Sequence, residues 1–329
     1  MLKGVILAAG RGTRLGPLTE SVPKPLLPVA NQPVMEQGIA CLRQLGITDI
    51  QVNISYRAEQ ILERFGDGSA YGVALHWLVE REPSGTAGGL KAMQQHLDGS
   101  RVVIIAGDAM LDVDLTVLLR AHQQRGAFAS LATLPVRDPS QYGVVVSEPN
   151  GAIQRFQEKP APGTEISNQA NTGIYIFEPE IFEMIPPGTF YDFALNVFPD
   201  ILRRGLPFFA FPVEGYWTDI GNPGDYLQAN LDYLGGRIHI TGRGVASDGN
   251  LIDAEAQVAG VQLSRCVIGA GATITPGSTL TDCVVWAGTQ LLEPCTLTSV
   301  ILTPNGSYAI EGKQARPLTS VTVSETVSG

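Results

Sequence analysis

The residues that most clearly suggest chemistry lie near the N-terminus, in a glycine-rich segment followed by a constrained lysine. The sequence LAAGRGTRL occupies residues 7–15, and Lys24 stands between two prolines. Gly10 and Gly12 lack side chains, so the backbone there can approach a ligand and direct N–H groups at phosphate oxygens. The prolines restrict the backbone of Lys24, which lowers the entropy cost of presenting its ammonium group. The pattern predicts a phosphate-binding loop, with a tight surface turn as the alternative.

The charge of this segment differs from that of the whole chain. The 329 residues include 22 Lys and Arg against 32 Asp and Glu, a net charge of −10, whereas residues 1–25 hold four basic residues and one acidic residue. A locally basic loop suits a triphosphate, while the acidic chain as a whole is a poor partner for nucleic acid or an anionic membrane. We therefore expect small-molecule substrates.

Two familiar phosphate-binding patterns do not match this loop. A dinucleotide fingerprint requires glycine at its sixth place, where Leu15 stands, and a helix directly afterwards, which Pro17 and Pro23 disfavour. A Walker loop requires Gly-Lys-Ser or Gly-Lys-Thr, which the sequence lacks. The loop must belong to another type of phosphate site.

Two aspartates are candidate metal ligands. Asp108 follows the apolar run 102–106, and the carboxyl end of a central parallel strand is where open α/β sheets bind ligands. Carboxylate oxygens there suit Mg²⁺, which typically binds one or two carboxylates together with substrate phosphates. Asp219 is the second candidate, although either residue alone could be a helix cap or a turn residue. We interpret Asp112 as a turn residue and Asp114 as the cap of a helix that begins at Leu115.

The elements that position these residues alternate between strands and helices as far as residue 235, which predicts βαβ units on a largely parallel sheet. The expected strands are residues 2–9, 49–55, 73–79, 101–106, 127–134, 143–146, 153–156, 173–177 and 207–211. The expected helices are residues 34–45, 58–65, 87–97, 115–124 and 190–203. The apolar run 102–106 is typical of a central strand that is buried on both faces.

After residue 236 the helical pattern gives way to a six-residue period. The apolar residues of this period are Ile268, Ile274, Leu280, Trp286 and Leu292. Such a period predicts a parallel β-helix whose inward residues stack from coil to coil, with an ordinary β-rich domain as the alternative. We therefore expect domains at residues 1–235 and 236–310, and a tail without regular pattern at residues 311–329.

Targeting signals and reactive side chains outside these motifs are few. The N-terminal apolar run ends at Arg11 with no cleavage site after it, and no stretch approaches the roughly 18 apolar residues of a spanning helix. The four cysteines form no C-x-x-C pair and fit reduced thiols, and the four histidines lie in none of the motifs. We expect a cytoplasmic protein that does not bind membranes and whose histidines are structural.

Residues 7–29, LAAGRGTRLGPLTESVPKPLLPV, resemble the signature of the sugar-1-phosphate nucleotidyltransferases, and the resemblance continues to about residue 235. It implies a Rossmann-like three-layer α/β/α catalytic domain. Many members of that family also carry a C-terminal left-handed β-helix, which agrees with the six-residue period. Flat β-helix faces are candidate contacts in a homo-oligomer.

The resemblance also implies a role for each matching residue. The residues that match the nucleotide-binding positions are Leu7, Ala8, Ala9, Gly10, Gly12, Thr13, Gly85, Thr86 and Gly88. Those that match the sugar-binding positions are Gly143, Glu158, Asn171 and Thr172. Asp108 and Asp219 match the family's magnesium ligands. Arg14 and Lys24 are expected at the triphosphate and Lys159 at the sugar phosphate.

The expected reaction is transfer of a nucleotidyl group from a nucleoside triphosphate to a sugar 1-phosphate, with release of pyrophosphate. The loop GTAG at residues 85–88 resembles that of guanylyltransferases, which favours mannose 1-phosphate with GTP. The segments YGVVV at residues 142–146 and FQEKP at residues 156–160 resemble a cyanobacterial type that uses glucose 1-phosphate with UTP. Glucose 1-phosphate with UTP or dTTP is therefore the alternative. A regulatory subunit that binds nucleotide sugar is the non-enzymatic alternative, and acyl transfer in the β-helix ranks low because only His239 lies near it. Replacing Lys24 is expected to reduce turnover far more than folding.

Overall fold

The structure, a computed structural model, describes residues 1–97 and 99–325. Contacts within the chain group the residues into two compact units. The first unit comprises Met1–Arg11 and Met35–Trp217, and the second comprises Gly12–Val34 and the chain from Thr218 onward. The glycine-rich segment is thus divided between the units. This grouping differs from a boundary at residue 235, and the expected domain limits stay predictions.

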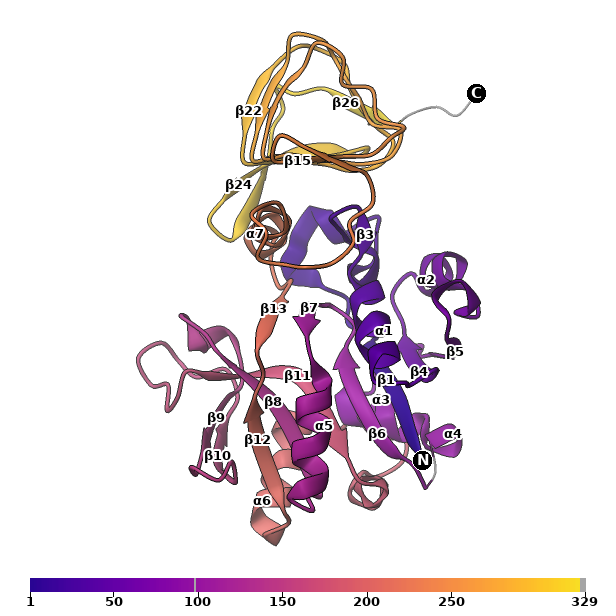
Figure 1. Ribbon diagram of the computed structural model, residues 1–329, viewed down its shortest axis with the longest axis vertical. Coiled ribbons are helices and arrows are strands. Elements are labelled where there is room, and N and C mark those ends of the chain that lie inside the picture. The colour runs from indigo at the N-terminus through magenta and orange to yellow at the C-terminus, as the bar shows by residue number, and fades with distance from the viewer. Residues whose placement is uncertain (98, 326–329) are drawn as a thin grey trace. The chain divides into compact units, whose positions relative to one another are not determined.

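The first unit is built on a nine-stranded sheet in which the order β10-β9-β11-β6-β1-β4-β5 is extended by β8, which pairs with β11, and by β12, which pairs with β8 (Figure 1). The strands are β1 (Leu2–Ala8), β4 (Asp49–Ile54), β5 (Ala74–Val79), β6 (Arg101–Ala106), β8 (Ala129–Pro135), β9 (Val144–Ser147), β10 (Ile153–Gln157), β11 (Gln169–Phe177) and β12 (Phe208–Pro212). Each expected strand is present, within a few residues of its predicted limits.

The sheet is parallel in one half and mixed in the other. Strands β6, β1, β4 and β5 run parallel to one another, as predicted. Strand β11 is antiparallel to β6, β8 and β9, so the prediction of a largely parallel sheet was wrong for this half. The length of the connections explains the difference, since short turns such as the one between β9 and β10 can join only antiparallel neighbours.

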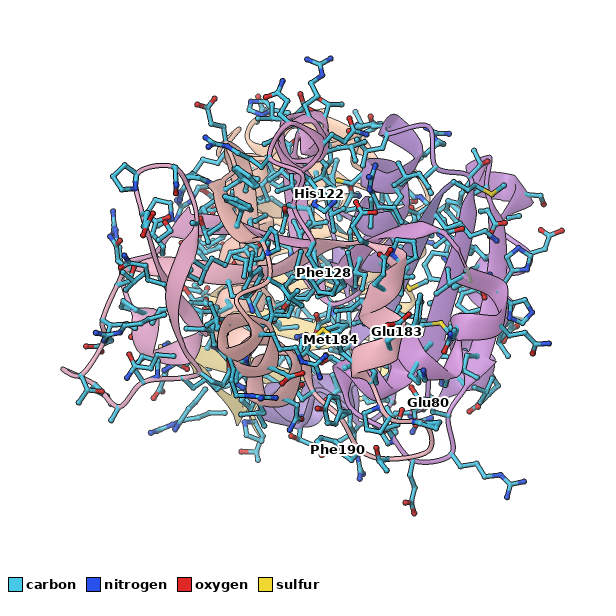
Figure 2. The ribbon with its side chains drawn as sticks, turned by 90° about the horizontal axis from the view of Figure 1, so that it is seen from below. Glu80, His122, Phe128, Glu183, Met184 and Phe190 are labelled. Atoms are coloured by element: carbon cyan, nitrogen blue, oxygen red, sulfur yellow. The ribbon has the colours of Figure 1, made fainter. Side chains whose placement is uncertain are left out.

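Helices cover both faces of this sheet. On one face lie α1 (Met35–Gln44), whose Gly38 packs close to Ile6 and Ile105, and α5 (Leu115–Gln124). The other face is covered by α3 (Thr86–Ala92), α4 (Gln94–Leu97) and α6 (Phe198–Arg204), which share one apolar core with alternate strand residues. Phe128 and Met184 belong to this core (Figure 2). The three-layer α/β/α architecture is confirmed. Helix α2 (Ala58–Phe65) lies beside helix α1, and an ion pair between Arg64 of α2 and Glu36 of α1 joins the two helices.

Two local differences from the expected elements, and one agreement, concern the segments after β6 and before α6. Asp112 lies in strand β7 (Ala109–Val113) rather than in a turn, because the chain reverses earlier, at Gly107 and Asp108. Asp114 caps α5 as predicted and accepts a hydrogen bond from the backbone of Thr116 at 2.8 Å. The helix expected at residues 190–203 begins as the π-helix Phe193–Val197, capped by Asp192, before α6.

The second unit begins with the rest of the glycine-rich segment, folded onto a helix from much later in the chain. It contains the 3₁₀ helices η1 (Thr13–Thr19) and η2 (Lys24–Leu26), the short strands β2 (Pro28–Val29) and β3 (Gln32–Pro33), and helix α7 (Pro223–Leu234). The buried Tyr226 of α7 donates a hydrogen bond to the carbonyl of Pro28 at 2.7 Å, and Asn230 accepts one from the backbone of Ala30 at 3.0 Å. Helix α7 therefore fixes the segment that carries Lys24.

The C-terminal part of this unit is a parallel β-helix, as predicted. Its short strands include β15 (Asn250–Ile252), β16 (Gln262–Ser264), β17 (Val267–Ile268), β18 (Thr273–Ile274), β19 (Thr279–Thr281), β20 (Val284–Val285), β21 (Thr289–Leu291), β22 (Thr296–Thr298) and β23 (Val300–Thr303). They stack in the parallel orders β15-β17-β20-β23, β16-β19-β22 and β18-β21.

The step from β15 to β17 is 16 residues, and the coils that follow are 17 residues long, one fewer than three hexapeptides. Strand partners such as Val267 and Val284, or Leu280 and Leu297, are 17 positions apart. The predicted period therefore holds for Ile268, Ile274 and Leu280, which are buried, and then shifts by one residue to Val285, Leu291 and Leu297. The prediction was wrong for the last two of its positions. Leu292 is 49% exposed, and Trp286 packs against Tyr226 of α7, to whose hydroxyl its Nε1 donates at 2.8 Å.

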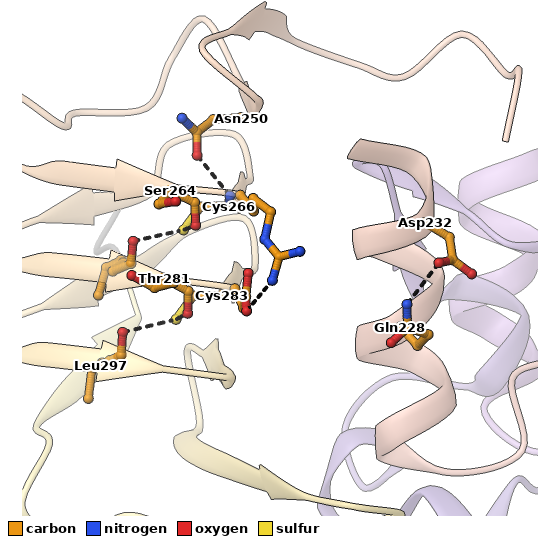
Figure 3. Close-up of polar contacts among 11 residues, drawn as sticks. Gln228, Asp232, Asn250, Ser264, Cys266, Thr281, Cys283 and Leu297 are labelled. Carbon is orange, nitrogen blue, oxygen red and sulfur yellow. Dashed lines mark hydrogen bonds and ion pairs between the residues drawn. The ribbon is translucent and has the colours of Figure 1, made fainter. Parts of the chain in front are cut away.

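One corner of each coil has a repeated backbone conformation. Asp248, Arg265, Asp282 and Ser299 follow one another at intervals of 17 and all have φ between 48° and 56°, the left-handed region that non-glycine residues seldom adopt. Just after this corner, Asn250, Cys266 and Cys283 lie one above the other (Figure 3). The Asn250 side chain accepts from the Cys266 backbone at 2.8 Å, and the thiol of Cys266 donates to the Leu280 carbonyl at 3.3 Å. All four cysteines are free thiols, as expected.

The region after Glu311 is more regular than the sequence predicted. Strands β24 (Gly306–Glu311) and β25 (Gln314–Pro317) form an antiparallel hairpin on β23, and β26 (Val323–Glu325) pairs with β21. The prediction of an unpatterned tail from residue 311 was wrong as far as residue 325, because backbone pairing with existing strands needs no strong side-chain pattern. Residues 326–329 lie outside the described part of the chain.

Candidate functional site

The first unit contains a cavity of about 260 Å³ at the carboxyl ends of β1, β4 and β6. Its lining residues are Leu7, Ala9, Gly10, Asn53, Glu80, Pro83, Gly85, Thr86, Ala106, Asp108, Gly173, Tyr175 and Asp192. Six of these were predicted as nucleotide or metal ligands: Leu7, Ala9, Gly10, Gly85, Thr86 and Asp108. The structure thus brings the start of the glycine-rich loop, the N-terminus of α3 and Asp108 to one place.

Close backbone packing places Asp108 at this edge. It follows β6 after Gly107, whose N–H donates to the carbonyl of Leu7 at 2.8 Å. A Cβ atom at Gly107 would lie 2.8 Å from a side-chain carbon of Ile6, so only glycine lets β6 end this close to β1. Asp108 therefore faces the same cavity as the first residues of the phosphate loop.

The N-terminus of α3 is locked to the segment before the π-helix. Gly85 has φ 83°, and a Cβ atom there would collide with the carbonyl oxygen of Tyr191. The hydroxyl of Thr86 donates to Asp192 and accepts from the backbone of Phe193, both at 2.9 Å. Gly88 does not line the cavity, since its N–H donates to the same Tyr191 carbonyl at 2.9 Å. This part of the cavity wall is fixed before any ligand binds.

Sequence reasoning missed a carboxylate that a hydrogen-bond chain holds at the cavity. The Asn53 side chain accepts from the backbone N–H of Ala8 at 3.1 Å and donates to Glu80 Oε1 at 2.6 Å. The backbone N–H and the hydroxyl of Ser84 both donate to the other oxygen, Glu80 Oε2. Gly89 leaves room for this arrangement, because a Cβ atom there would lie 2.5 Å from Asn53 Nδ2. An asparagine near the end of a buried strand was the available signal.

The predicted sugar-binding residues form a second group in the first unit. A Cβ atom at Gly143 would lie 2.7 Å from Glu158 Oε2, so the glycine makes room for that carboxylate. Burial raises the pKa of Glu158, Lys159 lowers it, and Asp192 raises it further. Lys159 has φ 40° and places its ammonium 3.6 Å from Glu158 Oε1, with its side chain 60% exposed. The glycine and the neighbouring lysine thus hold the Glu158 carboxylate in a partly buried position.

Asn171 and Thr172 lie on β11, where the pairing with β8 is irregular between Asn171 and Tyr175. Asn171 Nδ2 donates to the hydroxyl of Tyr175, which lines the cavity, at 2.9 Å. Thr172 is buried, and its hydroxyl donates to the carbonyl of Ala132 at 2.8 Å. Asn171 is thus linked to the cavity through Tyr175, whereas the Thr172 hydroxyl is used within the fold.

The second unit assembles the predicted cations around Asp219, which ends β13 (Gly215–Asp219). Lys24 Nζ lies 2.8 Å from Asp219 Oδ1, and Arg14 Nη2 lies 3.4 Å from Asp219 Oδ2. Lys24 is 5% exposed although it is charged. Gly12, with φ 69°, precedes η1, which starts at Thr13, and a Cβ atom at Gly12 would lie 3.1 Å from the Lys24 side chain. Two cations of the N-terminal segment and an aspartate far along the chain therefore form one charged cluster.

Carboxylate oxygens, the donor atoms that magnesium prefers, are present at both predicted ligands, Asp108 and Asp219. Asp108 offers carboxylate oxygens to a cavity that is large enough for part of a substrate, which suits an ion that shares its ligands with substrate phosphates. Both oxygens of Asp219 already face a cation. Among residues 1–97 and 99–325 no group of three or more His, Cys, Asp or Glu side chains could hold a metal.

A comparison with family models identifies the first two thirds of the chain. Residues 3–236 match the model described as nucleotidyl transferase. The chain belongs to the nucleotidyl transferase family. This confirms the resemblance seen in the sequence, and the matched range of the nucleotidyl transferase includes every residue predicted for its site.

Individual relatives agree with this assignment. The chain is 43% identical to the UTP–glucose-1-phosphate uridylyltransferase of Synechocystis over 69% of its length and 62% of the relative's, and 37% identical to the mannose-1-phosphate guanyltransferase of Kluyveromyces lactis over 71% and 65%. It thus spans less than two thirds of the length of either relative. A putative glucose-1-phosphate thymidylyltransferase from Bacillus anthracis has a similar fold, with a TM-score of 0.66 and 27% identity over 73% of this chain and 97% of that one.

The described helices include none that is long and apolar enough to cross a membrane.

Proposed function

We propose that the protein transfers a nucleotidyl group from a nucleoside triphosphate to a sugar 1-phosphate and releases pyrophosphate. The observation that carries the proposal is the cavity at the carboxyl edge of the sheet, where the start of the glycine-rich loop, the N-terminus of α3 and Asp108 meet. The family membership of the chain supports it, as do relatives named for this type of reaction.

The chemistry needs positioning and charge neutralisation rather than a general base. A phosphate monoester has its second pKa near 6, so the attacking sugar phosphate is largely dianionic at neutral pH. Its oxygen would attack the α-phosphorus in line, and pyrophosphate would leave. The barrier arises mainly from bringing two anions together, which preorganised cations lower. Arg14 and Lys24 are proposed to bind the triphosphate, and Lys159 to bind the sugar phosphate.

Mg²⁺ is the proposed cofactor, with Asp108 as its ligand from this chain and Asp219 as a second candidate. When bound, the ion supplies positive charge to the phosphates. Lys24 and Arg14 face Asp219 in the structure, so the second unit holds two cations in one cluster, which supports their proposed role at a triphosphate. Glu158, held beside Lys159, is proposed to accept hydrogen bonds from sugar hydroxyls.

The base and the sugar are the finer part of the proposal, and two observations favour different pairs. The resemblance of the loop at residues 85–88 to guanylyltransferases, together with the 37% identity to a mannose-1-phosphate guanyltransferase, favours GTP with mannose 1-phosphate. The 43% identity to a uridylyltransferase named for glucose 1-phosphate favours UTP with glucose 1-phosphate as the second candidate.

The experiment is a matrix of GTP, UTP, dTTP, CTP and ATP against mannose, glucose and N-acetylglucosamine 1-phosphates, with Mg²⁺, in which pyrophosphate release is measured. One dominant pair is expected. Pyrophosphate release that is highest with GTP and mannose 1-phosphate would support the guanine assignment, and release that is highest with UTP and glucose 1-phosphate would support the alternative. Nucleotide binding without release in any combination would replace the proposal by a regulatory, nucleotide-binding role.

A further inference from the structure

The hairpin formed by β24 and β25 leaves the last coil of the β-helix and ends in a tight turn. Glu311 pairs with Gln314, so Gly312 and Lys313 form a two-residue turn between the strands. Gly312 has φ 59°, and glycine at the first position of such a turn is typical of the type II′ geometry. The turn therefore holds the backbone of Lys313 in one orientation.

The tip of the hairpin presses on the first turn of α7. A Cβ atom at Gly224 would collide with the carbonyl oxygen of Gly312, so the two backbones approach as closely as glycine allows. Gly224 lies five residues after Asp219, on the segment whose Asn222 caps α7 by accepting from the backbone of Asp225 at 3.0 Å. The hairpin thus supports the turn that leads from Asp219 into the helix.

The base of the same hairpin contacts the N-terminal segment that supplies Arg14 to the Asp219 cluster. Asn305, in the turn between β23 and β24, donates to the hydroxyl of Ser21 at 3.0 Å. Ser21 lies two residues after η1, whose second residue is Arg14. One hairpin therefore touches both segments that supply the Asp219 cluster, one through its tip and the other through its base.

Lys313 also takes part in the electrostatics of this cluster. Burial raises the pKa of Asp225. The positive charge of Lys313 lowers this pKa more strongly than that of any other cation. The charge of Asp219 raises this pKa, and the charge of Arg14 lowers it to a smaller extent. Asp225 is therefore within the field of both Asp219 and Arg14. A half-buried carboxylate at this place competes with Asp219 and with an incoming phosphate for the Arg14 guanidinium unless another cation balances it.

We propose that the β24–β25 hairpin is a positioning element of the phosphate-binding cluster and that Lys313 keeps Arg14 available to a nucleoside triphosphate by balancing Asp225. This inference rests on the proposed function of Arg14 and Lys24 at the triphosphate. It assigns a role in nucleotide binding to a residue beyond the range 3–236 that matches the family model.

The test uses the whole chain and five variants. Lys313→Ala removes the balancing charge, Lys313→Arg retains it, Asp225→Asn removes the carboxylate, and Lys313→Ala combined with Asp225→Asn removes both members of the pair. Arg316→Ala is the matched control, because Arg316 lies on the same hairpin and pairs instead with Glu311 at 3.0 Å. The affinities for GTP and UTP are measured by calorimetry without sugar phosphate, together with KM, kcat and the melting temperature.

We expect Lys313→Ala to weaken binding of the preferred nucleotide about fivefold, the size of one partly screened charge interaction, with a matching rise in KM and little change in kcat. Lys313→Arg should bind within about twofold of the wild type, and the double variant within about twofold of Asp225→Asn. Arg316→Ala should bind like the wild type. Equal affinities of Lys313→Ala and wild type, or no recovery in the double variant, would overturn the inference. A wild-type protein that binds neither nucleotide would instead overturn the proposed function.

Discussion

Replacement of Lys24 by methionine is expected to reduce both stability and turnover, for reasons that the structure makes quantitative. The Lys24 side chain is 6% exposed and its ammonium lies 2.8 Å from Asp219, whose side chain is 23% exposed. Removing one partner of a buried pair typically costs about 3–5 kcal/mol. Because Asp219 is partly solvated and keeps Arg14 at 3.4 Å, we expect a smaller loss, about 2–3 kcal/mol.

Such a loss corresponds to a fall in melting temperature of about 4–10 °C for a unit of this size. Turnover should fall by about 100-fold or more, since a preorganised charge at the transferred phosphates is lost. This differs from the expectation formed from the sequence, that mainly turnover would suffer, because burial and pairing of Lys24 could not be seen there.

The assay combines thermal melting with pyrophosphate release at saturating substrates, for Lys24→Met, Asp219→Asn and the double variant. The double variant removes both charges, so it should recover most of the stability but none of the turnover. If Lys24→Met melts like the wild type, the ion pair does not stabilise the fold as argued. If its turnover is within tenfold of the wild type, Lys24 does not serve the triphosphate.

Three further predictions follow from other features. Burial lowers the pKa of His122, whose ring contacts Ser130 and Glu178 at 2.9 Å. The unfolded chain then binds a proton more readily, so stability should be lost as pH falls from about 6.5, and a melting series from pH 8 to pH 5 should be flatter in His122→Gln. Leu291→Ala should cost about 2–5 kcal/mol in urea unfolding and Leu292→Ala less than about 0.5, because only the former side chain is buried; the reverse order would contradict the 17-residue coil. Asp108→Asn should abolish pyrophosphate release while the melting temperature changes by less than about 3 °C, and a large loss of stability would show that the carboxylate is structural.

The sequence was sufficient where a local pattern sets the structure. Alternating apolar runs located the strands of the first unit because buried strands must be apolar, and Asp114 was identified as a cap because a side-chain acceptor is needed at that position. Asp108 could be placed at the cavity because the carboxyl ends of parallel strands share one edge of the sheet.

The sequence was insufficient where contacts are distant along the chain. The clamp on Glu80 depends on Asn53, 27 positions earlier, and Lys24 and Asp219 are 195 positions apart. Nothing in the tail marks Lys313 as belonging near α7. The coil length implied by the six-residue period was wrong for a different reason. Six-residue spacing describes each face of the β-helix correctly, but it does not reveal the corner at which one residue is omitted from the coil.

That coil spacing has a consequence for how the C-terminal region can change its length. Helix α7 meets the first part of the stack where Tyr233 and Leu251 both approach Gly242, the middle where Tyr226 contacts Trp286, and the end where Gly224 meets Gly312. Its 12 residues span about 18 Å, and the four steps from β15 to β24 span about 19 Å. The length of helix α7 therefore matches the height of the strand stack that it contacts. Duplication of one coil would preserve every stacking contact, yet it would carry the hairpin about 5 Å past the start of the helix.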